Sequence, residues 1–169
     1  MDILDVIVTR RSIRKFEDKN VPEELIEKVL EAGRWAPSGL NNQPWRFAEV
    51  RDNAIKEKLS VLTHYSRIVR DADVLIAVFM DSASGYHRVK DSQAIGACIQ
   101  NMLLEAHGLG LGAVWLGEII RSDAQIREVL GLGVGNDLEL MAVIALGYPA
   151  EKPKAPRRKA LKDLIVFRG

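Results

Sequence analysis

The sequence has little of what disulfides and metal sites require. It contains one cysteine, Cys98, and three histidines in 169 residues. A single cysteine forms neither an internal disulfide nor a multi-cysteine metal site. His64, His87 and His107 lie too far apart for a local metal motif, so no bound metal is expected. Cys98 stands among apolar residues and is interpreted as an inert core residue.

Long hydrophobic runs and an excess of one charge are also missing. The formal net charge is +1, from 24 basic and 23 acidic residues, which argues against a general nucleic-acid-binding protein. No apolar stretch reaches the roughly 20 residues of a membrane-spanning helix. The first residues carry an acid where a secretory signal carries positive charge. We therefore expect a cytoplasmic protein with no membrane segment.

The composition that remains is typical of a folded domain. Hydrophobic residues make up 47% and charged residues 28%, and the length fits one domain over residues 1–169. Apolar runs predict strands at 45–50, 73–79, 113–116 and 140–146. Helical spacing predicts a short first helix and further helices at 22–33, 52–62, 90–105 and 122–130. Pro22 is expected as the first helical residue of the second helix, and Asp52 and Ser122 as N-caps. Glycines 131, 133 and 135 predict a turn.

Helices and strands interleave, so we expect an α+β fold around one central sheet. The helix at 90–105 is apolar on more than one face, which is compatible with a subunit interface. The last segment, 150–169, contains Pro153 and Pro156 and is predicted to be an extended C-terminal arm.

Positive charge is concentrated near the two ends of the chain. Arg10, Arg11 and Arg14 surround Ser12, and six more basic residues lie between positions 152 and 162. Arginine binds phosphate through paired, charge-assisted hydrogen bonds. If the fold brings the two segments together, they form a local anion site. The alternative is two solvated surface stretches.

Two further segments contain groups that could contact a planar ligand. The loop at 37–45, Pro-Ser-Gly-Leu-Asn-Asn-Gln-Pro-Trp, offers hydroxyl and amide groups beside an aromatic ring, although it could also be a simple turn. Gly117 follows an expected strand, where a ligand could approach the backbone, although it could equally just end the strand. The glycines from 108 to 112 follow a helix and precede a strand, so they do not match a dinucleotide-binding motif. No nucleophile motif is present, so an enzyme of this sequence would depend on a cofactor.

Taken in order, these segments resemble the flavin-dependent nitroreductase family over nearly the whole chain. The segments that carry the resemblance are Arg-Arg-Ser-x-Arg after a short helix, Pro-Ser-x-x-Asn-x-Gln-Pro-Trp before the first strand, a long helix ending in Gly108-Leu-Gly110, a Trp-x-Gly strand end, and a basic tail after Gly147-Tyr-Pro149. The resemblance implies a three-layer fold, in which helices flank a mixed, mostly antiparallel central sheet. It also implies an intertwined homodimer with FMN at the interface.

The resemblance further implies which residues bind FMN. Those expected at the phosphate and ribityl chain are Arg10, Arg11, Ser12, Arg14, Arg157 and Arg158. Those expected to reach the flavin from the partner subunit are Pro37, Ser38, Gly39 and Asn41. Leu116 and Gly117 are expected beside the isoalloxazine, with the Gly117 amide near N5. Arg14 is the candidate for stabilising negative charge near N1 and O2.

The implied activity is that of an FMN-dependent NAD(P)H oxidoreductase. NADH or NADPH would give a hydride to N5 and leave, and a nitroaromatic, quinone or similar acceptor would then enter the same pocket, which gives ping-pong kinetics. The alternatives are flavin cleavage or reductive dehalogenation on the same fold, a flavin-binding protein without catalysis, or a site for another phosphate ligand.

The sequence departs from the family pattern in two ways. Gly39 replaces the second serine of the family's Pro-Ser-Ser. The chain is also short, so only 64–70 and 82–89 are candidate covers of the pocket. We expect an open pocket and a broad acceptor range.

Overall fold

The computed structural model describes residues 2–133 and 137–169. Within these residues four strands form one sheet in the order β1-β2-β4-β3, and every neighbouring pair is antiparallel. The strands are β1 (Trp45–Val50), β2 (Val74–Asp81), β3 (Gly112–Leu116) and β4 (Leu138–Gly147). A parallel bridge joins Ser12 to Ala113 of β3, so a mixed, mostly antiparallel sheet is confirmed.

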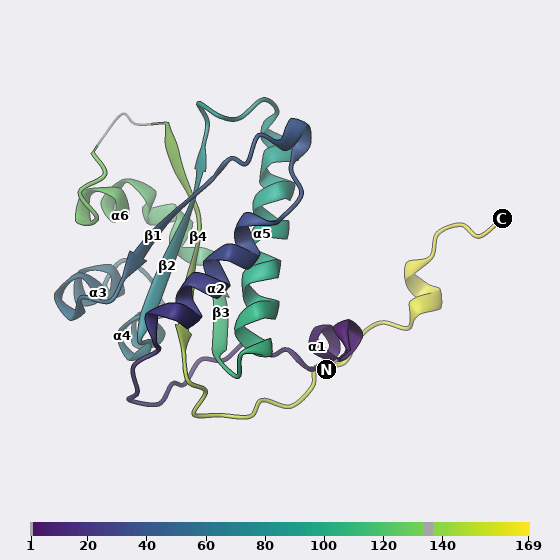
Figure 1. Ribbon diagram of the computed structural model, residues 1–169, viewed down its shortest axis with the longest axis horizontal. Coiled ribbons are helices and arrows are strands. Elements are labelled where there is room, and N and C mark those ends of the chain that lie inside the picture. Colours follow the sequence, from purple (N-terminus) through teal and green to yellow (C-terminus); the bar gives the residue numbers. More distant parts are fainter. Residues whose placement is uncertain (1, 134–136) are drawn as a thin grey trace.

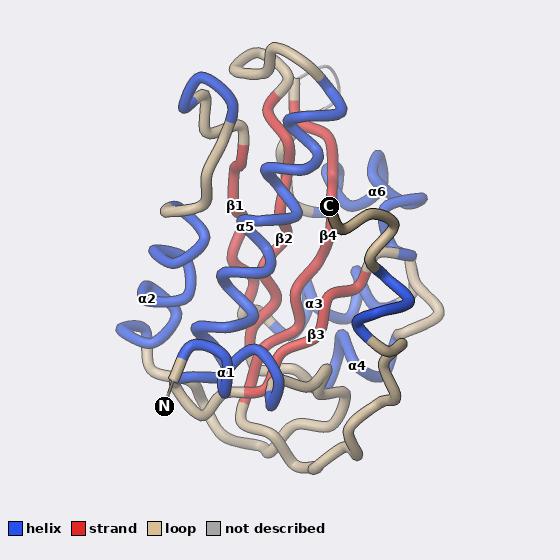
Figure 2. The backbone as a smooth tube through the Cα atoms, turned by 90° about the vertical axis from the view of Figure 1, so that its right-hand side faces the viewer, coloured by secondary structure: helices blue, strands red, loops and turns tan. Residues whose placement is uncertain are grey.

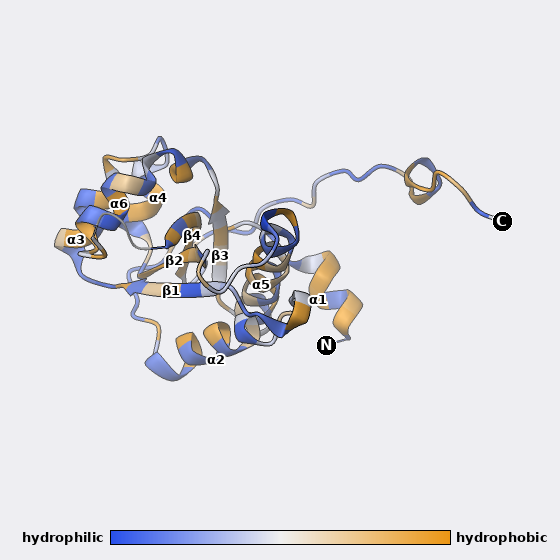
Figure 3. Ribbon diagram, turned by 90° about the horizontal axis from the view of Figure 1, so that it is seen from above, coloured by the Kyte–Doolittle hydropathy of each residue, from blue (hydrophilic) through white to orange (hydrophobic). Residues whose placement is uncertain are grey.

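Helices cover both faces of the sheet. Figures 1 and 2 show α2 (Glu23–Arg34) and α5 (Arg88–Gly108) on one face. Seen from above, α3 (Asn53–Ser60), α4 (Ser66–Asp71) and α6 (Asp123–Val129) lie on the other (Figure 3). Short 3-10 turns are η1 (Gly39–Asn41), η2 (Glu118–Ser122) and η3 (Leu161–Leu164). The three-layer arrangement is confirmed.

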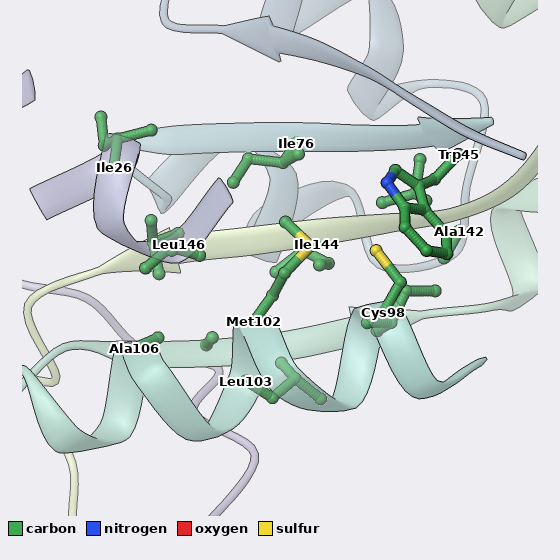
Figure 4. Packing of buried hydrophobic residues seen from close by; sticks show 14 of the residues in the cluster. Ile26, Trp45, Ile76, Cys98, Met102, Leu103, Ala106, Ala142, Ile144 and Leu146 are labelled. Carbon is green, nitrogen blue, oxygen red and sulfur yellow. The ribbon is translucent and has the colours of Figure 1, made fainter. Parts of the chain in front are cut away.

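Side-chain alternation along the strands divides the core into two clusters. Ile76 of β2 packs toward α2 and α5, while Leu75 packs toward α3, α4 and α6, because successive strand residues point to opposite faces. The register between β2 and β4 shifts by one residue after Val78. Leu140 and Ala142 consequently face opposite sides, as expected at a β-bulge. Figure 4 shows the cluster between α5 and the sheet.

Most of the expected elements form, with corrections at their ends. Asp52 caps α3 by accepting a hydrogen bond from the Ile55 amide at 2.9 Å. Ser122 does not cap α6, because its hydroxyl donates to the Leu62 carbonyl at 2.8 Å. Pro22 is the N-cap of α2 rather than its first helical residue. The expected turn glycines 131 and 133 have positive φ angles, whereas position 135 lies outside the described residues.

Both chain ends run beside the same edge of the fold. α1 (Ile3–Thr9) contributes no buried residue and lies near the C-terminal end of α5 (Figure 1). After β4 the chain pairs with the N-terminal segment, where the Ala150 amide donates to the Lys15 carbonyl at 2.9 Å. The segment that follows leads away from the body of the molecule to the C-terminus (Figure 1). Among the described residues, no helix combines the length and apolar character needed to cross a membrane.

Candidate functional site

The arginine-rich segment is fixed to the edge strand β3. The Ile13 amide donates to the Ala113 carbonyl at 3.0 Å. This close approach depends on Gly112, because a Cβ there would lie 2.9 Å from the Cβ of Ile13. The Arg14 amide donates to Glu151 Oε1 at 2.7 Å, which ties the segment to the start of the C-terminal arm. Strand β3 therefore determines where the arginines lie.

The fold brings Arg158 of the C-terminal segment near Arg10 of the N-terminal segment. Burial, followed by the positive charges of Arg11 and Arg158, lowers the pKa of the Arg10 guanidinium, so Arg158 lies within electrostatic reach of Arg10. Among the described residues, no carboxylate lies within 4.0 Å of the guanidinium groups of Arg10, Arg14, Arg157 or Arg158. Such unneutralised positive charge favours binding of an anion.

Gly117 lies at the other end of β3. The four residue steps from Ala113 to Gly117 span about 13 Å of extended strand. The indole of Trp115 is partly exposed and lies beside Gly117, since a Cβ at Gly117 would be 3.8 Å from Trp115 Nε1. Leu116 packs into the cluster on the opposite face. A ligand on the Trp115 side of the strand would therefore meet the Leu116 backbone and not its side chain.

Glu118, which was not identified as a site residue from the sequence, connects the chain just after Gly117 to Thr63 and Arg121. The Thr63 hydroxyl donates to Glu118 Oε2 at 2.7 Å, and Arg121 pairs with Oε1 at 2.7 Å. The hydrogen bond from Thr63, with help from the His64 amide and Arg121, lowers the pKa of the Glu118 carboxyl. These contacts fix the direction in which the Gly117 backbone leaves the strand.

The segment 64–70, expected as a pocket cover, is mainly a core helix. Ile68 and Val69 of α4 are buried against the sheet. Its first residue approaches η2, which follows β3, because His64 Nε2 lies 3.0 Å from the guanidinium of Arg121.

The loop at 37–45 has an unusual backbone conformation that side-chain hydrogen bonds support. Leu40, Asn41 and Gln43 have φ angles of 55°, 55° and 47°, in the left-handed region that few non-glycine residues adopt. The Ser38 hydroxyl oxygen accepts a hydrogen bond from the Gln43 amide at 3.0 Å. Asn42 donates to the Asp91 carboxylate of α5 at 2.8 Å, which attaches the loop to the first turn of that helix.

Asp91 is a second carboxylate that holds neighbouring segments in place and that was not identified from the sequence. It is 2% exposed and accepts hydrogen bonds from the amides of Tyr86 and His87 at 3.0 and 2.9 Å. Burial raises its pKa, but the bonds from His87, Asn42 and Tyr86 outweigh burial, so the pKa of the Asp91 carboxyl is lowered. An acid in the first turn of a helix is a known capping signal, and that signal could have identified it.

Gly39 has a structural explanation. A Cβ at this position would overlap the hydroxyl of Tyr86. Tyr86 belongs to the segment 82–89, so this segment does lie against the loop at 37–45. The phenol occupies the space that a side chain at position 39 would need.

The two halves of the expected site lie at opposite ends of α5. The loop residues Pro37, Ser38 and Gly39 line a pocket together with Lys90. At the other end, burial and the charges of Arg10 and Arg11 lower the pKa of His107. The 17 residue steps from Lys90 to His107 correspond to about 26 Å of helix. Figure 2 shows the same separation, with η1 and α1 at opposite ends of α5.

Comparisons with known proteins agree on one family. The sequence pattern of the nitroreductase family matches residues 7–64 and 60–148. A protein of Methanothermobacter thermautotrophicus, provisionally named NADH dehydrogenase/NAD(P)H nitroreductase, is 43% identical over 155 residues, which cover 90% of this chain and 80% of the relative. A protein of Archaeoglobus fulgidus with the same provisional name is 37% identical over 154 residues, covering 89% of this chain and 87% of the relative.

A solved structure gives the same result. The crystal structure of a provisionally named nitroreductase from Desulfovibrio desulfuricans, in complex with FMN, superposes with a TM-score of 0.94 and 47% identity. The alignment covers 100% of this chain and 98% of that chain. The chain described here therefore belongs to the nitroreductase family.

Proposed function

We propose that this protein is an FMN-dependent NAD(P)H oxidoreductase that reduces nitroaromatics, quinones or similar small acceptors. The observation that carries the proposal is the unneutralised arginine cluster at one end of β3, with Gly117 at the other end of the same strand. This arrangement suits a ligand with a phosphate at one end and a planar ring at the other. The similarity to a nitroreductase solved with FMN supports the choice of cofactor.

The residues present fit FMN. Arg10, Arg14 and Arg158, with the Ser12 hydroxyl, would hold the phosphate and ribityl chain, because guanidinium groups pair with phosphate oxygens. Gly117 would let the ring approach the backbone closely. Arg14 remains the candidate for stabilising negative charge on the reduced cofactor. When bound, FMN supplies the capacity to take a hydride from a nicotinamide and pass electrons to an acceptor.

Catalysis in this proposal requires a homodimer. The loop residues Pro37, Ser38, Gly39 and Asn41 lie about 26 Å along α5 from the arginines, so one chain cannot bring both to one FMN. A second copy would supply the loop. The exposed apolar side chains support such an interface, because large exposed apolar surfaces mark association sites. They occur on α1 (Ile3, Leu4, Ile7 and Val8) and on the arm (Leu161, Leu164, Val166 and Phe167) (Figure 3).

A visible absorption spectrum of the purified protein, before and after anaerobic addition of NADH or NADPH, tests the proposal. We expect flavin bands that bleach with at least one nicotinamide and return when an acceptor is added. Arg10→Ala combined with Arg158→Ala should weaken FMN binding, whereas Arg67→Ala, on the exposed surface of α4, should not. Protein that remains colourless with added FMN would contradict the proposal, and flavin bands that never bleach would limit the protein to flavin binding.

A further inference from the structure

A small pocket lies beside the loop that the proposed dimer would place on the partner's flavin. Its volume is about 300 Å³, and it opens between the loop at 37–39 and the first turns of α5. The polar side chains that line it are Ser38, Tyr86, Lys90 and Gln93, and Pro37 and Ala94 supply apolar wall. Pockets of this size, with apolar walls and a few polar groups, are typical of small-molecule sites.

Tyr86 forms one wall of this pocket. Its hydroxyl lies against the Gly39 backbone. Its own amide donates to the buried Asp91 carboxylate at 3.0 Å, and so does the amide of His87 at 2.9 Å. Because Asp91 also accepts from Asn42, the backbone at Tyr86 and the loop are held by the same buried group. A planar ligand would meet the aromatic ring that this backbone carries.

Lys90 gives the pocket its charge. It is the charged residue among those that line the pocket, and its Nζ lies 5.3 Å from the centroid of the Tyr86 ring. Within residues 2–133 and 137–169, no carboxylate lies within 4.0 Å of this ammonium group. The neighbouring charges are engaged elsewhere, since Arg88 pairs with Glu139 at 2.6 Å and Asp91 faces the loop. The ammonium group therefore has no anionic partner within the described chain.

We propose that Tyr86 and Lys90 form the acceptor subsite of this enzyme and select aromatic acceptors that carry an acidic group. The ring of such an acceptor would pack against Tyr86, and its carboxylate would pair with Lys90 through a charge-assisted hydrogen bond. The inference rests on the proposed function, which places this pocket next to the partner's flavin. It narrows the broad acceptor range expected from the sequence to one chemical class.

Two matched ligand pairs test the selection. Benzoate and benzamide have nearly the same shape, differ in charge and are not reduced, so their dissociation constants with the FMN-loaded protein can be measured by calorimetry. The second pair, 4-nitrobenzoate and 4-nitrobenzamide, reports kcat and KM. Lys90→Met removes the charge and keeps the apolar stem. Lys58→Met, on the exposed surface of α3, is the matched control.

The expected result is a loss confined to the acidic ligands. Lys90→Met should weaken benzoate binding about tenfold and raise KM for 4-nitrobenzoate by a similar factor, because one charge-assisted bond is lost. Both amides should change by less than about twofold, since neutral ligands make no ion pair. Tyr86→Ala should weaken all four ligands. Lys58→Met should change none.

Other outcomes would overturn the inference. Equal effects of Lys90→Met on acid and amide, or no effect on either, would exclude a charge-selecting role. A loss of FMN occupancy in Lys90→Met would assign this lysine to the cofactor instead. Failure of the proposed function is visible separately, because wild-type protein would then show no flavin bands or no bleaching before any acceptor is added, and the inference would fall with it.

Discussion

At the residue scale, position 39 and Tyr86 are two sides of one contact. A side chain at 39 would collide with the end of the tyrosine, which can rotate away. We therefore expect Gly39→Ala to change the free energy of unfolding by less than about 0.5 kcal/mol, while weakening benzoate binding. In a Tyr86→Ala background the same substitution should have no further effect on binding, because the colliding group is gone. Thermal unfolding and calorimetry measure the two effects. Additive losses in the double variant would contradict the contact.

Asp91 makes a pH-dependent contribution to stability. Its pKa is lowered in the folded protein, so the ionised form stabilises the fold above the unfolded-state pKa of about 3.9. That contribution disappears as pH falls through the still lower folded-state pKa. We expect Asp91→Asn to cost about 1–3 kcal/mol near pH 7. The difference from wild type should shrink below about pH 4, as unfolding measured across pH would reveal. Asp18→Asn, at an exposed carboxylate, is the matched control.

The sequence predicted which residues could form an anion site but not which residues organise it. The proximity of Arg10 and Arg158 was implied by the family resemblance, whereas the charge pattern alone left two solvated surface stretches as the alternative. Asp91 and Glu118 were missed because their partners are distant in sequence. Asn42 is 49 positions from Asp91, and Thr63 is 55 positions from Glu118. A carboxylate whose partners are that remote looks like any other surface acid until the fold is known.

At the element scale, Gly112 decides whether the arginine segment can lie on β3. A Cβ there would meet the branched carbon of Ile13, which cannot rotate aside. We expect Gly112→Ala to destabilise the protein by about 1–3 kcal/mol through overpacking and to weaken FMN binding as the arginines shift. Denaturant unfolding and FMN titration measure these effects. Gly108→Ala, where a Cβ meets nothing within 4 Å, is the control and should be close to neutral. Unaltered FMN affinity in Gly112→Ala would argue against this dependence.

The contact between α2 and α5 can be followed through Cys98. Its thiol is fully buried and close to Gly33 of α2, and burial raises its pKa to about 12. Because the thiolate is the reactive form, a disulfide reagent at pH 8 should react with the folded protein only as fast as these helices separate. Reaction should be rapid in denaturant. Rapid labelling of the native protein would mean that the two helices separate readily.

Elements with a strong apolar pattern were predicted more accurately than those without one. β1 has the predicted bounds, and α5 extends beyond the expected 90–105 at both ends. Asp91 explains the earlier start, since it binds the amides that precede the helix. α4 was not predicted as a helix, because six residues are too few to establish a helical period. The bulge in β4 depends on pairing with β2 and has no local signal.

At the scale of the whole molecule, the arm should serve association rather than folding of the body. Four apolar side chains near its end, Leu161, Leu164, Val166 and Phe167, are exposed. Deleting residues 160–169 keeps both Arg157 and Arg158 but removes these side chains. Each buried apolar side chain contributes about 1.5–3 kcal/mol, so we expect at least a tenfold weaker dimer. Light scattering across a dilution series measures this change, with the full chain as the reference. Equal dimer affinity would contradict the role of the arm.

The three-layer architecture was predictable because several weak motifs occur in one order along the chain. Each motif alone has an ordinary structural explanation. The distance between them was not predictable, because it depends on α5 lying along the sheet with the loop at one end and the arginines at the other. Sequence order places the arginines and the loop only about 25 positions apart, whereas the fold separates them by the length of a helix.

That separation has a genetic consequence. If each site takes its arginines from one chain and its loop from the other, a variant defective in the arginines and a variant defective in the loop can complement each other within one dimer. A chain with Arg10→Ala and Arg14→Ala, mixed equally with a chain altered at Ser38 and Asn41, would form hybrid dimers with one intact and one doubly defective site. Random reassociation would make half of the dimers hybrids. Two inactive proteins would then together recover about a quarter of the wild-type sites.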